Sequence, residues 1–187
     1  MTRSRISILD PHPQRVFVDA DAKTAAFFVR TLPALVDARL IEELKTYSET
    51  HGRCNVRICL HDAPDALHHD MVALERRDRY YRPHKHLRKG DTFHLLEGRL
   101  GIFSFDDVGV VIDAVVIGPG EIYRTAANAY HAIMPLTDYV IHHESKLGPF
   151  EGSGDSIYPD WAPDACEVVA VKKYLEMLTT SLPGETK

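Results

Sequence analysis

Short apolar segments separated by turn residues run through the chain from about residue 53 to residue 147, and this pattern constrains the fold more than any other feature. The segments recur at intervals of roughly ten residues, and RKG, EG, DDVG and GPG lie between them. Short strands at this spacing predict an all-β sandwich or barrel rather than a sheet built from βαβ units. The expected strands are NVRICLH, DMVALERR, RYYRPHKH, DTFHLL, RLGIFSFD, VVIDAVVIG, EIYRT, YHAIM and DYVIHHES.

Helical periodicity appears on either side of these strands. In LVDARLIEELKTYSETHG one face is apolar and Gly52 stands where a helix would stop; the face consists of Leu35, Leu40, Ile41, Leu44 and Tyr47. The segment CEVVAVKKYLEMLTTSL shows the same period at Val169, Tyr174, Leu175 and Leu178. We therefore expect one structural domain, in which residues 1–52 form an arm and a helix, residues 53–164 a barrel, and residues 165–187 a helix and tail. Within the first part, residues 1–22 are expected to be a loose arm.

The composition is that of an ordinary globular protein. Of the 187 residues, 44% are hydrophobic and 26% are charged, and the formal net charge is -5. Without a strong basic patch, a nucleic-acid partner is not expected. Three cysteines cannot form a full disulfide framework, which fits a reducing cytosol. The apolar runs are too short for a signal peptide or a membrane span, so we expect a cytoplasmic protein with no membrane partner.

A group of histidines with one carboxylate indicates a metal site. Because alternate side chains of a strand share a face, His84 and His86 point the same way. Asp91 opens the returning strand after the turn LRKG, and His131 lies in the later strand YHAIM. Three imidazoles and one carboxylate suit one divalent ion of zinc, iron, nickel or manganese. The alternative is that these are surface or structurally satisfied core histidines in a chain that has 11 of them.

The same strand alternation predicts which way the other histidines of this region face. Asp91 and Phe93 share one face, so His94 faces the other way and is not expected at the site. Of His142 and His143 only one can face inward, and the pattern assigns neither a role. We interpret both as core or surface histidines.

The spacing of these residues resembles the first motif of the cupin superfamily, in which His-x-His is followed after four residues by an acid and after six more by glycine. The matching residues are His84, His86, Asp91 and Gly98. The second motif is matched loosely by residues 118–120, GPG, and by His131, with a longer gap. The resemblance implies a mainly β fold, a cupin-type double-stranded β-helix (jelly-roll barrel) with an N-terminal and a C-terminal helix.

Within the superfamily, the chain resembles the WbuC-type cupin-fold metalloproteins over about residues 53–164. The matching stretches are RICLH, YYRPHKH, FDDVG, EIYRTAANAYHAI, HHESKLGPF and DWAP. One difference concerns the metal site: the family usually has Glu where this chain has Asp91. Since Asp is one methylene shorter, it either ligates the ion from slightly farther back or supports the site through a hydrogen bond.

The resemblance also implies residues around the ion. Arg57 and His61 lie in RICLH, where alternation places them on one face; His61 would be a catalytic proton-transfer group or a hydrogen-bond donor to a ligand residue. Arg57 would bind an anionic ligand or pair with a structural carboxylate. Tyr81, Tyr123 and Arg124 match family positions, and they would hydrogen-bond a small polar substrate or pack at the barrel mouth.

The sequence is compatible with three different functions. The first is a metal-dependent enzyme, an isomerase or an iron-dependent dioxygenase, that acts on a small polar, sugar-like substrate; the WbuC resemblance implies a link to surface-polysaccharide biosynthesis. The second is a non-catalytic module that binds metal or sugar. The third is a metal-free cupin epimerase that uses its histidines as acid and base. A homodimer is expected in each case, because a partner commonly covers exposed sheet edges.

Overall fold

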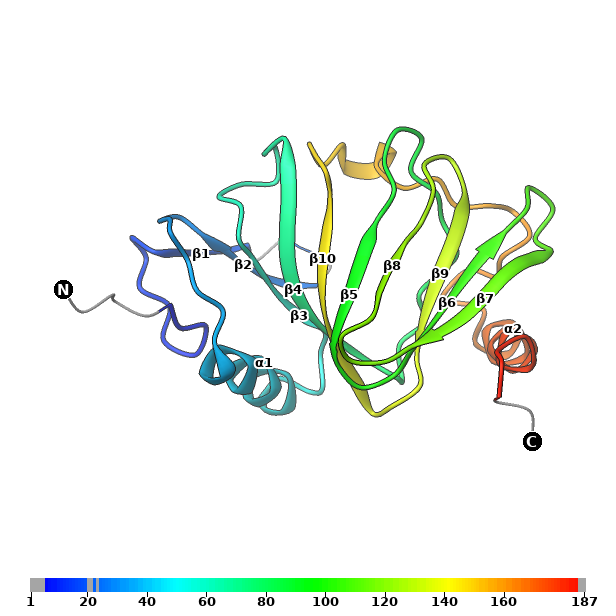
Figure 1. Ribbon diagram of the computed structural model, residues 1–187, viewed down its shortest axis with the longest axis horizontal. Helices are drawn as coiled ribbons and strands as arrows, with labels where there is room; N and C mark the ends of the chain where they lie inside the picture. Colours follow the sequence, from blue (N-terminus) through cyan, green and yellow to red (C-terminus); the bar gives the residue numbers. More distant parts are fainter. Residues whose placement is uncertain (1–5, 20–21, 23, 185–187) are drawn as a thin grey trace.

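The chain forms two β-sheets and two α-helices (Figure 1). The computed structural model describes residues 6–19, 22 and 24–184. The larger sheet has seven strands in the order β1 (Val16–Asp19), β2 (Ala25–Val29), β3 (Val56–Cys59), β4 (His68–Arg76), β10 (Tyr139–Leu147), β5 (Thr92–Glu97) and β8 (Ile122–Arg124). The smaller sheet has three strands in the order β7 (Val111–Ile117), β6 (Leu100–Phe105) and β9 (Tyr130–Pro135). The helices are α1 (Ala38–Thr50) and α2 (Val168–Thr180), and a 3-10 turn spans Gly152–Gly154.

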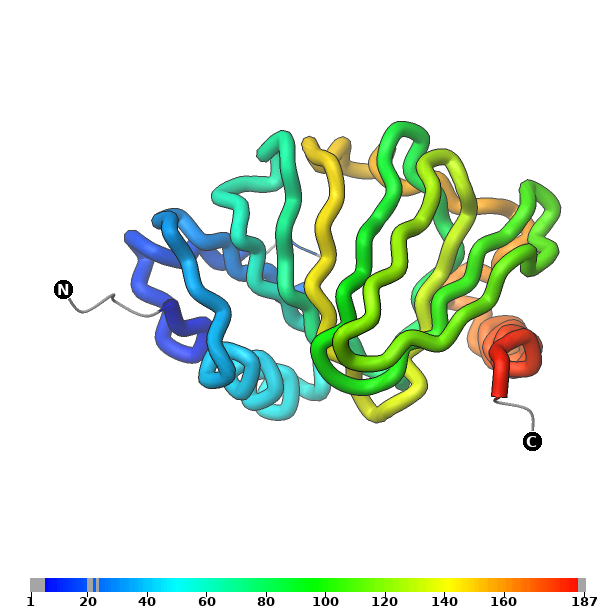
Figure 2. Tube along the Cα trace, in the orientation of Figure 1, coloured from blue at the N-terminus to red at the C-terminus, as the bar shows by residue number. Residues whose placement is uncertain are grey.

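Strands that are far apart in sequence pair with one another (Figure 2). Strand β10 lies between β4 and β5 and is antiparallel to both. Strand β6 pairs in the same way with β7 and β9. Because the chain crosses between the sheets before it returns to pair, the fold is the expected cupin-type jelly roll. The only parallel pair among the described strands is β2 with β3, and α1 supplies the crossover that a parallel pair requires.

Helix α1 covers the outer face of the larger sheet. Its Leu40 and Leu44 side chains are fully buried against outward-facing residues of β3 and β4. The helix begins where the Asp37 carboxylate accepts a hydrogen bond of 3.0 Å from the Leu40 N–H, which satisfies one of the free N–H groups of the first turn. Leu35 lies before the helix and is 61% exposed, so its predicted place on the apolar face is wrong.

The N-terminal segment packs more closely than expected. Ile6 and Ile8 are buried in the same apolar cluster as α1. The Ile8 N–H donates a hydrogen bond of 2.9 Å to Glu43 of this helix, and β1 pairs with β2. The prediction of a loose arm is therefore wrong for the described part of this segment; residues 1–5, 20 and 21 lie outside the described residues.

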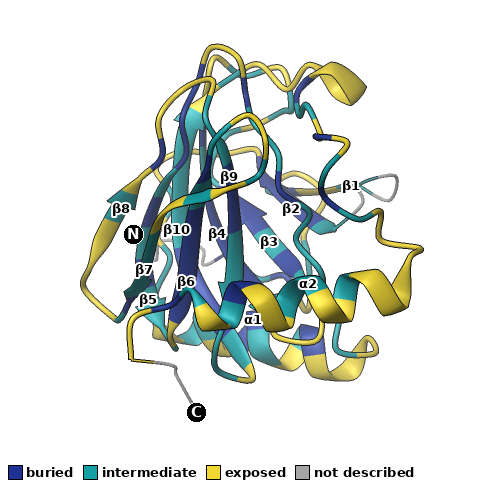
Figure 3. Cartoon of the chain, turned by 90° about the vertical axis from the view of Figure 1, so that its right-hand side faces the viewer, coloured by how far each residue is buried: buried dark blue, intermediate teal, exposed yellow. Residues whose placement is uncertain are grey.

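Helix α2 covers the outer face of the smaller sheet (Figure 3). Leu178, and Leu182 just after the helix, are buried against Phe103 and Phe105 of β6. Most of the remaining helix surface is exposed. Val169, which was predicted to lie on the packed face, is 71% exposed, so that prediction is wrong.

The inner faces of the two sheets enclose an interior that is apolar at one end and polar at the other. The apolar end is filled by residues from both sheets, namely Phe93, Leu95, Leu100, Ile102, Ile117 and Val140. At the polar end, β3, β4 and β10 present charged and imidazole side chains to a cavity. The candidate site lies at this polar end.

Candidate metal centre

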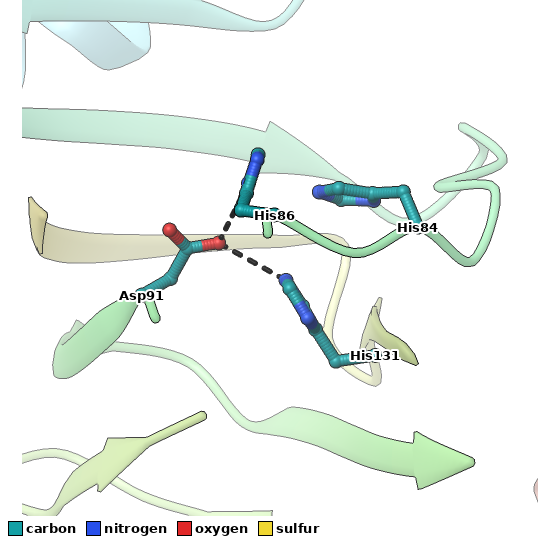
Figure 4. A group of neighbouring side chains, drawn as sticks. All are labelled: His84, His86, Asp91 and His131. Atoms are coloured by element: carbon teal, nitrogen blue, oxygen red, sulfur yellow. Dashed lines mark hydrogen bonds and ion pairs between the residues drawn. The ribbon is translucent and has the colours of Figure 1, made fainter. Parts of the chain in front are cut away.

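Four side chains from two separate parts of the chain converge at the polar end of the interior (Figure 4). They are His84, His86, Asp91 and His131, and each offers one ligand atom within 4.8 Å of the others. His86 and His131 lie on either side of the Asp91 carboxylate, with distances of 3.4 and 3.0 Å from their Nε2 atoms to Oδ2. This is the set of residues that the sequence predicts for a metal ion.

Backbone pairing explains how these residues meet. His84 forms a β-bridge with His131 of β9, with hydrogen bonds of 3.0 and 2.9 Å in the two directions. The next residue, Lys85, pairs with Ile157 on the other side. His84 and His86 therefore alternate as strand residues do, although this segment forms bridges only and not the longer strand that the sequence predicts.

Asp91 is held at the start of β5 by the segment that follows β8. Its N–H donates to the Thr125 hydroxyl (2.8 Å), and its carbonyl accepts from the Thr125 N–H (2.9 Å). Gly90 lies so close to Thr125 that a Cβ at this position would be 2.1 Å from the Thr125 carbonyl oxygen. A glycine directly before Asp91 is therefore part of what places the carboxylate.

Backbone carbonyls orient all three imidazoles. The Nδ1 atoms of His84, His86 and His131 lie 3.1, 2.5 and 3.1 Å from the carbonyl oxygens of Arg82, Asp155 and Ala129. A carbonyl only accepts, so each Nδ1 must carry the proton. The lone pair of each neutral ring is then on Nε2, which is the tautomer that a metal ion requires when it binds at that atom.

The cluster contains polar atoms without hydrogen-bond partners that could bind a cation. Within the described residues, His86 Nε2 and Asp91 Oδ1 are buried and have no hydrogen-bond partner. His131 faces oxygen acceptors with both ring nitrogens, and a neutral ring with its proton on Nδ1 has no hydrogen to offer Asp91, whereas a cation could bind both Nε2 and the carboxylate. Zinc binds nitrogen and oxygen atoms at about 2.0–2.2 Å, so the four ligand atoms, which now lie within 4.8 Å of one another, would draw closer together around an ion.

The electrostatics of the cluster favour an ionised Asp91 carboxylate beside a neutral His84. Although burial opposes ionisation of Asp91, the nearby Lys146 ammonium and the His131 hydrogen bond hold the pKa of this carboxyl well below its usual value. Burial, together with the neighbouring His131, lowers the pKa of His84 to about 4. Although burial opposes the charged form of His86, the Asp91 carboxylate beside it raises the pKa of this ring.

The cluster opens into a cavity of about 570 Å³ through the rings of His84 and His86. Arg57, Cys59 and His61 of the RICLH segment line the same cavity, as alternation predicts. Its remaining wall includes the segment that carries the 3-10 turn, coloured orange in Figure 1, which crosses the strand ends after β10.

Two of these cavity residues are poorly suited to proton transfer or nucleophilic attack at neutral pH. Burial, then the neighbouring His69, lowers the pKa of His61 to about 4, and the two rings stack with centroids 4.3 Å apart. Burial raises the pKa of the Cys59 thiol to about 11. The catalytic role predicted for His61 therefore remains a prediction, and the geometry favours a hydrogen-bonding role.

Tyr81, Tyr123 and Arg124 are not among the described residues that line this cavity. The Tyr81 hydroxyl donates to the Arg76 carbonyl (3.0 Å). Tyr123 packs against the apolar end of the interior and donates to Asp113 (2.7 Å), while Arg124 is exposed. The structure does not bring the three to the metal cluster, because β8 lies at the sheet edge and the Tyr81 hydroxyl is engaged with the backbone.

The other histidines behave as strand alternation predicts. His94 is outside the cluster. His142 is fully buried in the interior beside Phe93, with ring centroids 5.4 Å apart. His143 faces outward and contacts Asp70, with 3.2 Å between Nε2 and Oδ1.

The charged residues of the cavity wall that were not predicted from the sequence include Glu75 on β4, and Glu144 and Lys146 on β10. Lys146 Nζ lies 2.7 Å from Glu144 Oε1 and 3.5 Å from Asp91 Oδ1. Although burial opposes both charges, this pairing raises the pKa of Lys146 and lowers that of Glu144. Alternation along HHESK puts Glu144 and Lys146 on one face, which is a signal that the sequence contains.

The comparisons with known proteins concern the fold. A family model for a domain of unknown function, DUF6016, matches residues 36–117, less than half of the chain. The comparison with curated proteins gives no match. Neither helix in the described part of the chain has the length and hydrophobicity that a membrane crossing needs.

Several solved structures are similar to this chain at low identity. KdgF from Halomonas sp. has 15% identity and a TM-score of 0.40, with 50% of this chain and 81% of that chain covered. Cellulomonas parahominis L-ribose isomerase has 14% identity and a TM-score of 0.45, with 56% and 69% covered. A cupin superfamily protein from Desulfitobacterium hafniense has 13% identity and a TM-score of 0.40, with 50% and 76% covered. At these values the likeness carries no argument about activity.

Proposed function

We propose that this chain is a metal-binding cupin whose ion is held by His84, His86, His131 and Asp91, and that it acts on a small polar, sugar-like ligand in the adjoining cavity. One observation carries this proposal: the backbone carbonyls that bind the three Nδ1 atoms turn three Nε2 atoms toward one buried carboxylate. A set of histidines that served only packing would not need this shared orientation.

The residues around the cluster indicate what kind of ligand it serves. When bound, the ion would polarise a carbonyl or hydroxyl oxygen, or support oxygen-dependent chemistry if it is iron. Four protein ligands leave coordination positions free on an ion that takes five or six. The cavity wall offers donors at Arg57 and Lys146 and an acceptor at Glu144, which suits a ligand with several polar groups.

The resemblance to the WbuC-type proteins supports a narrower version of this proposal. In this version the ligand is a sugar or sugar nucleotide of surface-polysaccharide biosynthesis, and the reaction, which the identity of the ion would decide, is an isomerisation or an iron-dependent dioxygenation. We also propose that the protein is a homodimer, and that residues 53–164 form the barrel, with residues 1–52 before it and residues 165–187 after it.

Two alternatives make different predictions. A non-catalytic module would have a closed coordination shell or would bind its ligand unchanged. A metal-free epimerase would use histidines as acid and base, and the lowered pKa values of His61 and His84, both about 4, argue against this at neutral pH.

Cobalt substitution tests whether the site has an open position. The protein would be loaded with Co²⁺, and azide would be added while the visible ligand-field bands are recorded. An open site predicts saturable changes in these bands, which His94→Ala should retain and the double variant His84→Ala/His86→Ala should lose. Bands that do not respond to azide would indicate a closed, structural ion and would contradict the enzymatic proposal.

A further inference from the structure

Glu75 has a carboxyl oxygen that finds no partner in the described part of the chain. It lies on β4 and lines the cavity, while its Oε2 atom is buried without a hydrogen bond. An ionised carboxylate can only accept hydrogen bonds, and burial of its Oε2 atom without a donor is costly. A protonated carboxyl group avoids the charge and gains an O–H donor.

The groups that face Glu75 come from three parts of the barrel: Arg57 on β3, Glu144 and Lys146 on β10, and Tyr81 after β4. The 2.7 Å pair between Lys146 and Glu144 keeps Glu144 ionised, so Glu75 lies near a carboxylate whose own cation is already engaged. Burial, followed by the charge of Glu144, raises the pKa of Glu75 to about 8, while Arg57, Lys146 and Tyr81 act in the opposite direction.

Two carboxyl groups in one cavity are thus driven to different protonation states. Their environments differ because Glu144 has an ammonium partner and Glu75 has none at comparable distance among the described ion pairs. In enzyme active sites, one member of such a pair commonly acts as the general acid and the other as the general base.

We infer that Glu75 is the proton donor of the cavity, a neutral carboxylic acid that offers its O–H to a carbonyl or hydroxyl oxygen of the ligand, while Glu144 accepts from a ligand hydroxyl. The ligand class rests on the proposed function: a neutral polyhydroxy compound supplies both the acceptor and the donor. If the proton is transferred, the O–H bond of Glu75 breaks, its electron pair stays on the carboxylate, and Arg57 is the cation that faces the new charge.

Two measurements on the whole protein test this inference without knowledge of the substrate. In the first, ¹³C-carboxyl-labelled glutamate is followed by NMR from pH 4 to pH 10, and Glu75→Gln identifies the resonance. One midpoint near 8 is expected, absent from Glu75→Gln and lowered in Glu144→Gln, where the neighbouring charge is removed. If every glutamate midpoint lies below about 6, Glu75 is an ordinary carboxylate and the inference is wrong.

The second measurement tests access from the solvent. A water-soluble carbodiimide activates protonated carboxyl groups, glycine ethyl ester traps them as amides, and mass spectrometry locates the products. At pH 7.5, Glu75 should be labelled faster than the exposed Glu121, and its labelling should fall as the pH rises through about 8. A high NMR midpoint without labelling would refute the ligand-facing role.

Metal analysis of the same preparations separates this inference from the proposed function. A protein that binds no ion but shows the midpoint near 8 contradicts the metal proposal and leaves Glu75 as the acid. A protein that binds one ion but lacks that midpoint contradicts the Glu75 inference alone.

Discussion

Replacement of Gly90 by alanine tests how the backbone places the metal-binding carboxylate. The new Cβ would lie 2.1 Å from the Thr125 carbonyl oxygen and 3.0 Å from its carbonyl carbon, and neither is a flexible side-chain end. The backbone must therefore shift, and Thr125 is the residue whose two hydrogen bonds hold Asp91. Overpacking of this kind costs about 1–3 kcal/mol. For a chain of this size, that predicts a fall in Tm of about 2–12 °C.

The same shift should weaken the metal site. Because Asp91 moves with Gly90 and Thr125, we expect metal affinity to fall by about 10–100-fold, as it does when a supporting contact of a ligand is lost. Differential scanning calorimetry of the metal-free protein and competition with a chromophoric chelator measure the two effects. Gly118→Ala is the matched control, since its Cβ would meet only Glu121 Oε2, at 3.6 Å. If Gly90→Ala behaves like Gly118→Ala in both assays, the reasoning about this contact is wrong.

Four further predictions follow from the site and the fold. His84→Ala or His131→Ala should abolish metal binding while His94→Ala keeps it, and loss of metal from His94→Ala would show that the strand alternation is misassigned. Because the ligand imidazoles must be neutral, metal measured after dialysis should be lost below about pH 6, and retention at pH 4 would count against a histidine-built site. The folded-state pKa of Glu75 is raised to about 8. The free energy of unfolding should therefore fall as the pH rises from the ordinary glutamate pKa toward 8, by at most about 1.4 kcal/mol per pH unit. In denaturant titrations, Glu75→Gln should not show this pH-dependent fall. Asp37→Ala should remove the cap of α1 and cost about 1 kcal/mol, a fall in Tm of about 2–4 °C by calorimetry, and an unchanged Tm would show that the cap contributes little.

Periodicity in the sequence predicts much of the fold and the core of the candidate site. Alternation places His84 and His86 on one side of the chain and excludes His94, and both statements agree with the structure. These predictions succeed because they depend only on local geometry, which the backbone imposes whatever the rest of the chain does.

Other features depend on contacts between distant segments, and the sequence does not reveal them. The carbonyl that orients His86 belongs to Asp155, and it reaches the ring only because the segment after β10 returns over the cavity. The Glu144–Lys146 pair was visible as an alternating pattern, but which face of β10 points inward depends on its place between β4 and β5. The packing of Ile8 under α1 likewise depends on tertiary structure.

Metal analysis of the purified, untagged protein beside the double variant His84→Ala/His86→Ala tests the central claim most directly. The account predicts about one transition-metal ion per chain in the unaltered protein and none in the variant, with Asp91 and His131 insufficient to hold it alone. Iron would direct the search for activity to oxygen-dependent reactions, and zinc, nickel or manganese to isomerisation and hydrolysis of sugars. A protein that contains no ion and takes up none when zinc, iron, nickel or manganese is added would contradict the account.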